Sequence, residues 1–209
     1  MDELTKTILL TGFEPFGGSH TNPSKLVALA LDGKAIGRCR VNSTVLPVDR
    51  TGGPQVLLGK MALYHPDAVI CLGEASRRAV VSVEKIAVNW MDYRIPDNQG
   101  EQLSDLPVDP EGPAAYFSTL PVREIYEQIL AGGIPAEISM SAGAFLCNQV
   151  FYAGLHFLAT QNLAVPMGFI HLPSLPEQAS RALSPYASMS FETSLRAVEI
   201  ALDVIEKRI

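Results

Sequence analysis

Apolar runs bounded by turn residues recur along the chain, together with two stretches in which apolar and polar residues alternate. Such runs predict strands that are buried on both faces, as in an α/β sheet, whereas apolar positions at helical spacing predict helices. The predicted strands are 6–13, 38–48, 67–73, 79–90, 137–140 and 166–173. The predicted helices are 23–33, 53–64, 122–131, 148–160 and 191–205. The pattern therefore indicates an α/β fold.

One of the predicted strands, 79–90, carries a carboxylate on an apolar face. Strict alternation puts Glu84 on the same side as Ile86 and Val88. A buried carboxylate is costly unless it is paired. Two interpretations stay open: a salt bridge to an arginine, or a carboxylate that orients a catalytic imidazole.

The loop after the first strand, residues 14–21, is flanked and lined by aromatic side chains. Phe13 and Phe16 either fold back into the core or line an apolar pocket at the carboxyl end of the strand, where α/β sheets bind ligands. Asn22 is a good N-cap and Pro23 suits the first helical position, so a helix is expected to begin there. The glycines of the loop do not form GxGxxG, so dinucleotide binding has little support.

Composition limits the class of protein. With 209 residues, 47% hydrophobic and 18% charged, the chain is expected to form a single domain, residues 1–209, with a sizeable core. The net charge of −6 argues against nucleic-acid binding, which favours a basic face. No run of about 18 apolar residues is present, so no membrane span is expected. The polar start, residues 1–6, is unlike a secretory signal. Residues 92–100 are rich in turn formers, and the stretch that follows them, 101–113, is expected to be an exposed excursion.

The cysteines are few and odd in number: Cys39, Cys71 and Cys147. Such a set fits a reducing cytoplasm and forms no disulfide framework. Cys71 lies in the middle of a strand and is expected to fill space, while Cys39, between two arginines, is expected to be a surface thiol. Neither CxxC nor HExxH is present, so no zinc site is expected.

Cys147 differs from the other two because a glycine-containing loop enters a predicted helix at this point. A helix N-terminus carries partial positive charge and unpaired N–H groups, which favour the thiolate over the thiol. The alternative is a packing role, since free cysteines are among the most buried residue types. A nucleophilic role requires a base elsewhere in the chain.

Four histidines could supply that base. His156 is nine residues further along the same helix as Cys147, about 13.5 Å along the axis, and cannot reach the thiol. His65 is expected at the opposite edge of the sheet, and His20, in the first loop, is expected to be solvated. His171 ends a strand at the edge where Cys147 is expected, so it is the favoured base.

These residues suggest a site for acyl transfer. Cys147 would attack a carbonyl carbon, and His171 would take the thiol proton and later protonate the leaving amine. Glu84 would hold the imidazole ring. It is the weakest member of the three, because a salt bridge would also explain it.

Four motifs add a family resemblance that spans nearly the whole chain. They are LTGFEPFGG with NPS (10–18 and 22–24), VEKIAVN with RIPDN (83–89 and 94–98), AGAFLCN (142–148), and GFIHLP with LPEQ (168–173 and 175–178). In this order they resemble pyroglutamyl peptidase I, also called pyrrolidone carboxyl peptidase, which forms cysteine peptidase family C15. Because four separate motifs agree, the resemblance is specific.

The resemblance implies an activity and a fold. The activity is removal of an N-terminal pyroglutamyl (5-oxoproline) residue from peptides through a thioester acyl-enzyme, with Cys147, His171 and Glu84 as the triad and with no metal or cofactor. The fold is a three-layer α/β/α sandwich around a mixed, mostly parallel sheet, of the phosphorylase/hydrolase-like type. The family is cytoplasmic and often tetrameric, so the expected partners are pyroglutamyl peptides and further copies of the chain.

The resemblance also implies which residues bind the substrate. The pocket for the pyroglutamyl ring falls on Phe13, Phe16, Asn22, Glu74, Phe145 and Leu146. Oxyanion stabilisation falls to Arg94 and the backbone N–H of Cys147. Such a pocket would hold the neutral lactam by stacking and burial. Polar pairing with the lactam would reject proline, whose ring lacks the carbonyl.

One turn departs from the family pattern. Residues 73–78 are Gly-Glu-Ala-Ser-Arg-Arg, where the family typically resembles Gly-Gln-Ala-Gly-Gly-Arg. Glu74 stands where the family has a glutamine beside the pyroglutamyl ring, and Ser76 and Arg77 replace glycines, so a stiffer or differently shaped loop is expected. Two other hypotheses stay open. One is a pyroglutamyl-binding relative with altered catalysis, and the other is a nucleoside-phosphorylase-like enzyme whose phosphate site would need Arg77 and Arg78.

Overall fold

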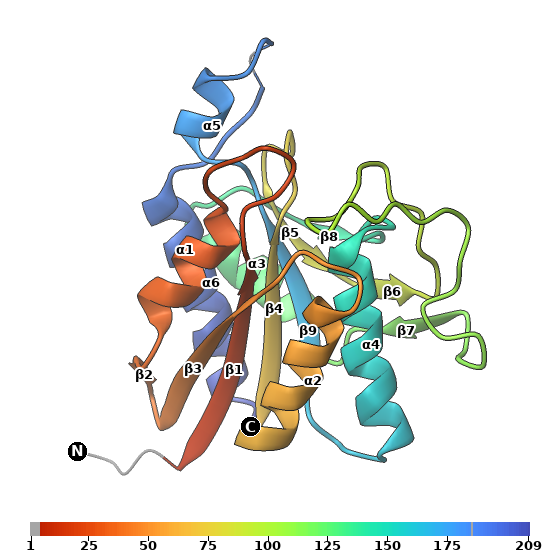
Figure 1. Ribbon diagram of the computed structural model, residues 1–209. Coiled ribbons are helices and arrows are strands. Elements are labelled where there is room, and N and C mark those ends of the chain that lie inside the picture. Colours follow the sequence, from red (N-terminus) through yellow and green to blue (C-terminus); the bar gives the residue numbers. More distant parts are fainter. Residues whose placement is uncertain (1–4, 185) are drawn as a thin grey trace.

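A seven-stranded sheet forms the middle of the molecule in this computed structural model, which describes residues 5–184 and 186–209. In chain order its strands are β1 (Lys6–Phe13), β2 (Ala35–Ile36), β3 (Cys39–Leu46), β4 (Ala68–Glu74), β5 (Val81–Glu84), β8 (Ala136–Ser139) and β9 (Met167–Leu172). In space they lie in the order β2-β3-β1-β4-β9-β5-β8 (Figure 1). Strands β3, β1, β4 and β9 are parallel, whereas β5 is antiparallel to β9 and parallel to β8. The sheet is therefore mixed and mostly parallel.

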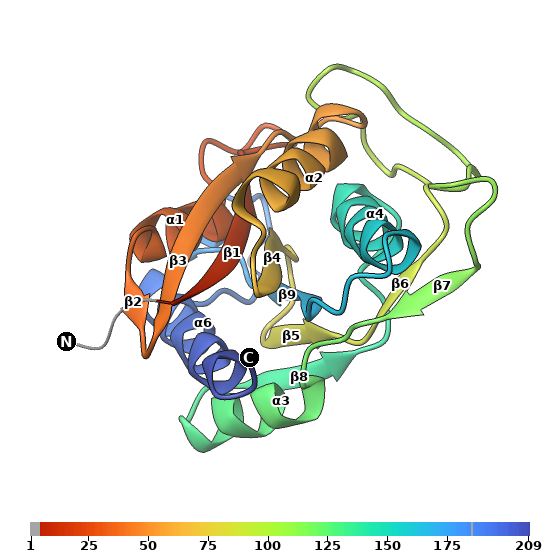
Figure 2. The same ribbon diagram turned by 90° about the horizontal axis from the view of Figure 1, so that it is seen from below.

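Helices cover both faces of this sheet (Figure 2). On one face lie α2 (Gly52–Tyr64) and α4 (Leu146–Thr160), and on the other lie α1 (Pro23–Leu31), α3 (Val122–Ala131) and α6 (Phe191–Glu206). A short helix, α5 (Pro176–Ser180), stands beyond the edge of the sheet where β1, β4 and β9 end (Figure 1). The three layers confirm the predicted α/β/α sandwich. No helix in the described part of the chain is long and apolar enough to cross a membrane, and residues 1–4 of the polar start lie outside that part.

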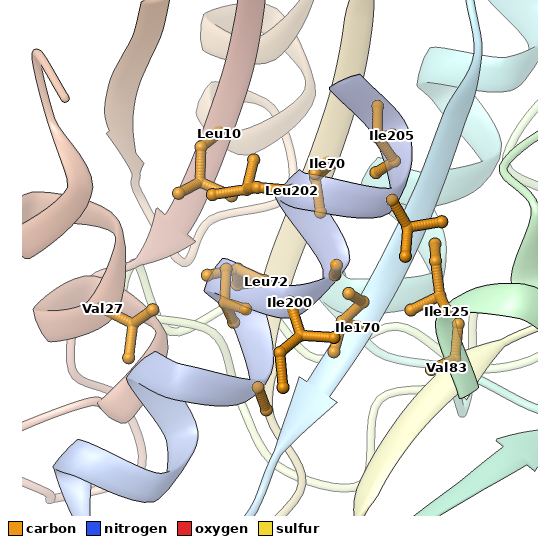
Figure 3. Packing of buried hydrophobic residues seen from close by; sticks show 14 of the residues in the cluster. Leu10, Val27, Ile70, Leu72, Val83, Ile125, Ile170, Ile200, Leu202 and Ile205 are labelled. Carbon is orange, nitrogen blue, oxygen red and sulfur yellow. The ribbon is translucent and has the colours of Figure 1, made fainter. Parts of the chain in front are cut away.

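Side chains alternate along the buried strands, so each face of the sheet has its own hydrophobic core. On the face of α1, α3 and α6, strand residues Leu10, Ile70 and Ile170 pack with Ile125 and Ile205 of the helices (Figure 3). The alternate residues of the same strands lie under α2 and α4; they include Leu9, Val69, Cys71 and Phe169. Burial on both faces explains why the central parts of these strands are mostly apolar.

The stretch 79–90 is not one strand, and that prediction is wrong. Strand β5 ends at Glu84, and β6 (Ile86–Val88) pairs instead with β7 (Ala115–Phe117) in a separate two-stranded sheet. The Asn148 side chain accepts from the Val88 N–H at 2.9 Å and donates to the Val88 carbonyl at 2.8 Å, which holds β6 against α4. Glu84 therefore does not share a face with Ile86 and Val88, and it is completely buried on β5.

The prediction that Cys39 is a surface thiol is also wrong. Cys39 is completely buried, because alternation along β3 points Cys39 and Val41 into the core while Arg40 points outward. Burial raises the pKa of the Cys39 thiol. Cys71, in contrast, fills space in the middle of β4 as predicted.

The stretch 101–113 contains no buried residue and is mostly exposed, which confirms that prediction. The turn-rich segment before it, 92–100, contains no helix or named strand, but its Asp97 side chain is buried and accepts three backbone N–H bonds. The neighbouring Asn98 donates to the Glu14 carboxylate at 2.8 Å and to the Pro15 carbonyl at 3.0 Å. This stretch therefore supports the loop that follows β1.

Candidate active site

The carboxyl ends of β4 and β9 place two residues side by side. Gly73 and His171 are register partners in these parallel strands, each one residue before its strand ends. His171 alternates with Phe169 toward the face covered by α4, and its side chain is almost completely buried. The imidazole thus lies at the sheet edge where the sequence predicts it.

A buried carboxylate holds this imidazole. Glu84 Oε1 lies 2.8 Å from His171 Nδ1. The antiparallel pairing of β5 with β9 sets the contact, because it places Glu84 opposite Phe169, two residues from His171 and on the same face of the sheet. An ionised carboxylate can only accept, so Nδ1 carries the proton and Nε2 is left to accept one.

The same carboxylate also forms a salt bridge, so this interpretation of Glu84 holds alongside the imidazole contact. Arg78 Nη1 lies 2.8 Å from Glu84 Oε1, and its Nη2 donates to the Ser141 carbonyl at 3.0 Å. Arg78 therefore links the turn after β4 to the loop that leads into α4. Its cation lies beside the buried carboxylate and compensates its charge.

Cys147 lies in the first turn of α4, one residue after the helix begins. Its Sγ lies over Gly73, since a Cβ built on that glycine would be 2.9 Å from the sulfur. Gly73 is the register partner of His171, and neighbouring strands are about 4.8 Å apart, so the thiol lies beside the imidazole. The structure thus brings together Cys147, His171 and Glu84 from α4, β9 and β5.

The surroundings of Cys147 disfavour the thiolate. Burial, and after it the negative charge of Glu84, raise the pKa of Cys147 to about 12. The helix N-terminus acts in the opposite direction, because its field favours the thiolate. A base must therefore remove the proton before the sulfur can attack.

The other three histidines lie elsewhere. His156 stacks on Tyr152 with ring centroids 5.8 Å apart, and its Nδ1 is 2.9 Å from the Tyr116 hydroxyl. His65 ends α2 in a left-handed conformation, next to the start of β4. His20 lines a cavity beside the first loop. His171 is accordingly the histidine that the fold places beside the thiol.

An apolar pocket lies against the thiol, and all six residues predicted to bind substrate line it. They are Phe13, Phe16, Asn22, Glu74, Phe145 and Leu146, together with Val48 and Cys147. We call this set the ring pocket. The Phe16 and Phe145 ring centroids are 6.0 Å apart, and the enclosed volume is only about 10 Å³. Even one water molecule needs about 10–15 Å³ of free volume. The ring pocket therefore has no room for a ligand in this structure, and we call this state closed.

Two polar side chains of the ring pocket already have partners. Asn22 caps α1, and its Oδ1 accepts from the Ser24 N–H at 3.0 Å. Glu74 accepts from Ser174 Oγ at 2.7 Å and from Gln178 Nε2 at 3.1 Å. Burial raises the pKa of Glu74, which favours its neutral form.

The turn after β4 keeps a glycine-like conformation although it contains no glycine after Gly73. Arg77 has φ 76°, a left-handed value that costs a residue with a Cβ roughly 1–2 kcal/mol. Its guanidinium lies over the Tyr186 ring, 6.0 Å from the centroid. Arg77 therefore holds a conformation that a glycine adopts without this cost.

The two predicted oxyanion groups are separated. The Cys147 backbone N–H belongs to the first turn of α4, where N–H groups lack helical partners. Arg94 is exposed and lines the cavity next to the ring pocket, together with Phe16. The backbone N–H therefore stands on the same residue as the sulfur, whereas Arg94 lines the neighbouring cavity.

A family model for pyroglutamyl peptidases matches residues 6–208. The chain belongs to the pyroglutamyl peptidase family. Pyrrolidone-carboxylate peptidases from Gloeobacter violaceus and Pyrococcus furiosus are 48% and 44% identical to it, over 95% and 94% of this chain and 96% of each relative. A solved structure of a mutant pyrrolidone carboxyl peptidase from Pyrococcus furiosus matches with a TM-score of 0.94 and 43% identity, over 97% of this chain and 100% of that one. The enzyme from Thermococcus litoralis matches with a TM-score of 0.94 and 40% identity, over 98% and 97%.

This member of the pyroglutamyl peptidase family has site residues that the sequence did not reveal. Arg78 pairs with Glu84, and Ser174 and Gln178 hold Glu74. Gln178 and Glu74 are 104 positions apart, so no local pattern connects them. The available signal was the LPEQ motif itself, which carries Gln178. Within the described residues, no cluster of three or more His, Cys, Asp or Glu side chains could hold a metal ion.

Proposed function

We propose that this chain, acting as one catalytic domain over residues 1–209, is a cysteine peptidase that hydrolyses the amide bond after an N-terminal pyroglutamyl residue. One observation carries the proposal: Cys147, His171 and Glu84 meet on one face of the sheet, against an apolar pocket. Family membership supports the choice of substrate. The pocket suits a small neutral lactam, which offers apolar surface and no α-amino charge.

The first half of the reaction uses the neutral thiol and the free ring nitrogen. His171 Nε2 takes the proton of Cys147, and the sulfur attacks the pyroglutamyl carbonyl carbon. Glu84, bonded to Nδ1, stabilises the imidazolium that forms. The Cys147 backbone N–H donates to the oxyanion, and Arg94 supplies a second donor when substrate brings its exposed side chain inward.

The second half releases both products. The C–N bond breaks, the His171 imidazolium protonates the departing amine, and a thioester joins pyroglutamate to Cys147. His171 then takes a proton from water, which attacks the thioester carbonyl. The C–S bond breaks, and pyroglutamate leaves as Cys147 recovers its proton.

Ring binding requires the ring pocket to open. Phe13 and Leu146 are buried in the core and fixed, whereas Phe16 stands on a loop and Phe145 on the segment before α4. Separation of the Phe16 and Phe145 rings would admit the lactam between them. The substrate thereby replaces an aromatic contact with its own stacking, so little apolar surface is exposed at any stage.

The nucleoside-phosphorylase hypothesis has little support from the geometry. Its phosphate site would need Arg77 and Arg78 to act together. Arg78 is committed to Glu84 at 2.8 Å, while Arg77 lies against Tyr186. The adjacent arginines therefore do not form one anion site.

A pyroglutamyl-amide assay with and without iodoacetamide tests the proposed function. The wild type should release an aryl amine, and alkylation should stop it. Cys147→Ala should lower kcat by roughly a thousandfold or more. Cys39→Ala is the matched control, because it removes a buried thiol outside the site, and it should leave activity sensitive to iodoacetamide. Full activity of Cys147→Ala would contradict the proposal, and binding without turnover would favour the catalytically altered relative.

We also propose that the protein works in the reducing cytoplasm as a homo-oligomer, which the family resemblance implies. All three cysteines are free, which suits a reducing compartment. Phe117 and Met140 are each 62% exposed, which leaves apolar surface for a second copy. Light scattering of the purified protein would measure the number of copies, and a monomer at all concentrations would contradict this part of the proposal.

A further inference from the structure

A second cavity, of about 430 Å³, opens directly beside the closed ring pocket. Phe16 and Glu74 line both spaces. The other walls are the loop 16–21, residues 94–95, and α5 with the segment after it. We call this cavity the leaving-side groove. It lies at the carboxyl edge of the sheet, where α5 stands clear of the strands (Figure 1).

The groove is placed to receive whatever follows the pyroglutamyl residue. With the ring in its pocket, the scissile carbonyl must lie at Cys147 Sγ, and the rest of the peptide must leave that pocket. The peptide cannot leave toward the sheet, because Sγ packs over Gly73 and the Phe169 ring lies beside the same glycine. The shared walls Phe16 and Glu74 lead from the ring pocket into the groove.

One side chain fixes the walls of the groove relative to each other. Gln178 Nε2 lies 3.1 Å from Ser19 Oγ, 3.3 Å from the Thr21 carbonyl and 3.1 Å from Glu74 Oε1. Its own oxygen accepts from the Leu175 N–H at 2.7 Å. This amide joins α5, the first loop and the end of β4, so the groove has a defined shape before substrate arrives.

The groove carries cations that lack a carboxylate partner. Its titratable side chains are His20, Glu74, Arg94, Glu177, Arg181 and Tyr186. Glu74 is occupied by Ser174 and Gln178, which leaves Glu177 as the other acid. Arg94 and Arg181 are both exposed, and among the described residues neither has a carboxylate within 4.0 Å. The chain as a whole has a net charge of −6, so two such guanidiniums in one groove form a local positive region. A positive region of this kind favours binding of an anionic group.

We propose that the leaving-side groove binds the residue after the pyroglutamate and favours a carboxylate there, with Arg181 as its partner; Arg94, proposed above as an oxyanion donor, adds positive charge to the same groove. The preferred substrates are then pyroglutamyl dipeptides with a free carboxyl end and peptides with an acidic second residue. The inference rests on the proposed function, since it assumes that the acyl group is bound at Cys147. Arginine suits the task because its planar fork pairs with a carboxylate through two hydrogen bonds.

The test compares pyroglutamyl-alanine with its carboxamide, which differ only in the charge of the leaving residue. For the wild type, KM should be about fivefold lower for the carboxylate, the size expected of an exposed charge pair. This ratio should fall as NaCl is raised. Arg181→Gln should bring the ratio close to one, and Arg181→Lys should keep most of the preference.

Arg123→Gln provides the matched control. Arg123 is an exposed arginine at the start of α3, on the sheet face opposite α4, and its loss should leave the ratio unchanged. Equal KM values for the two peptides with the wild type would overturn the inference, as would a ratio that survives Arg181→Gln. Cleavage of neither peptide would instead contradict the proposed function, and with it the inference.

Discussion

The ring pocket and the leaving-side groove share two walls but are held in place by different means. The side chains that we propose as catalytic stand beside the ring pocket on β5, β9 and the first turn of α4, where ladder register and burial fix them. The groove is enclosed by the first loop and α5, which side-chain hydrogen bonds to Gln178 connect. This difference teaches that the chemistry and the choice of peptide are carried by separable parts. Changes in the first should alter kcat, and changes in the second should alter KM.

The largest effect is expected from Glu84→Gln. The amide can donate to His171 Nδ1 and would favour the tautomer whose Nε2 already carries a proton, so kcat should fall by roughly 10³–10⁴-fold. The assay is steady-state cleavage of a pyroglutamyl amide, with circular dichroism to confirm folding. Glu137→Gln is the control, because Glu137 is half exposed and lies 3.9 Å from the same Arg78. A loss smaller than tenfold in Glu84→Gln would show that the carboxylate serves mainly as a salt-bridge partner.

Gly73→Ala should have the next largest effect. The added Cβ would lie 2.9 Å from Cys147 Sγ and 2.8 Å from the Phe169 ring, so the sulfur must move. A displacement of the nucleophile by about 1 Å costs on the order of 100-fold in kcat. Gly59→Ala on α2 is the control, since nothing lies within 4 Å of its added Cβ. Unchanged kcat in Gly73→Ala would mean that the ladder does not fix the position of the thiol.

The difference between side chains fixed by strand register and walls held by side-chain hydrogen bonds also explains how much of the fold and the site could be predicted from the sequence. Strands β1, β4 and β9 bury both faces, so their apolar runs locate them, and the edge where they end locates Cys147 and His171. The alternating pattern of apolar and polar residues does not show which strand a segment pairs with. It therefore misses the break at Lys85, after which β6 leaves the main sheet and pairs with β7. Cys39 is misjudged for a related reason: its charged neighbours suggest exposure, although period-two alternation turns them away from it.

The groove could not be predicted in the same way. Gln178 contacts Ser19 across 159 positions and Glu74 across 104, and only the folded chain brings these segments together. The closed state of the ring pocket likewise depends on two rings, Phe16 and Phe145, from distant segments. Family motifs identify such residues individually, whereas their hydrogen bonds and the volume they enclose require the structure.

Gln178→Ala tests the groove side of the comparison. Loss of one amide should free α5 and the first loop, so KM for pyroglutamyl peptides should rise about tenfold while kcat changes little. Gln161→Ala is the control, because Gln161 is an exposed amide at the end of α4, at the far end of that helix from Cys147. A fall in kcat as large as that of Gly73→Ala would show that the two regions are not separable.

The smallest effect concerns Glu74, which belongs to both regions. Burial raises its pKa in the folded state above the unfolded value, so the folded state holds this proton more tightly. The stabilisation is complete below the unfolded pKa and is lost as the pH rises through the folded pKa. Glutamine does not titrate, so Glu74→Gln should have a higher Tm relative to wild type at pH 8 than at pH 4. The measurement is thermal unfolding at both pH values.

Glu177→Gln separates this effect from a general change of charge. Glu177 is exposed at the start of α5 and lines the same groove, so Glu177→Gln measures the effect of removing a carboxyl that is not buried. If Glu74→Gln behaves in the same way, the carboxyl is not destabilised by burial and Glu74 is an ordinary ionised wall of the groove. If the Tm difference grows with pH, the neutral carboxyl is the form that fits between Ser174 and Gln178, and the wall shared by the two cavities is uncharged in the most stable state.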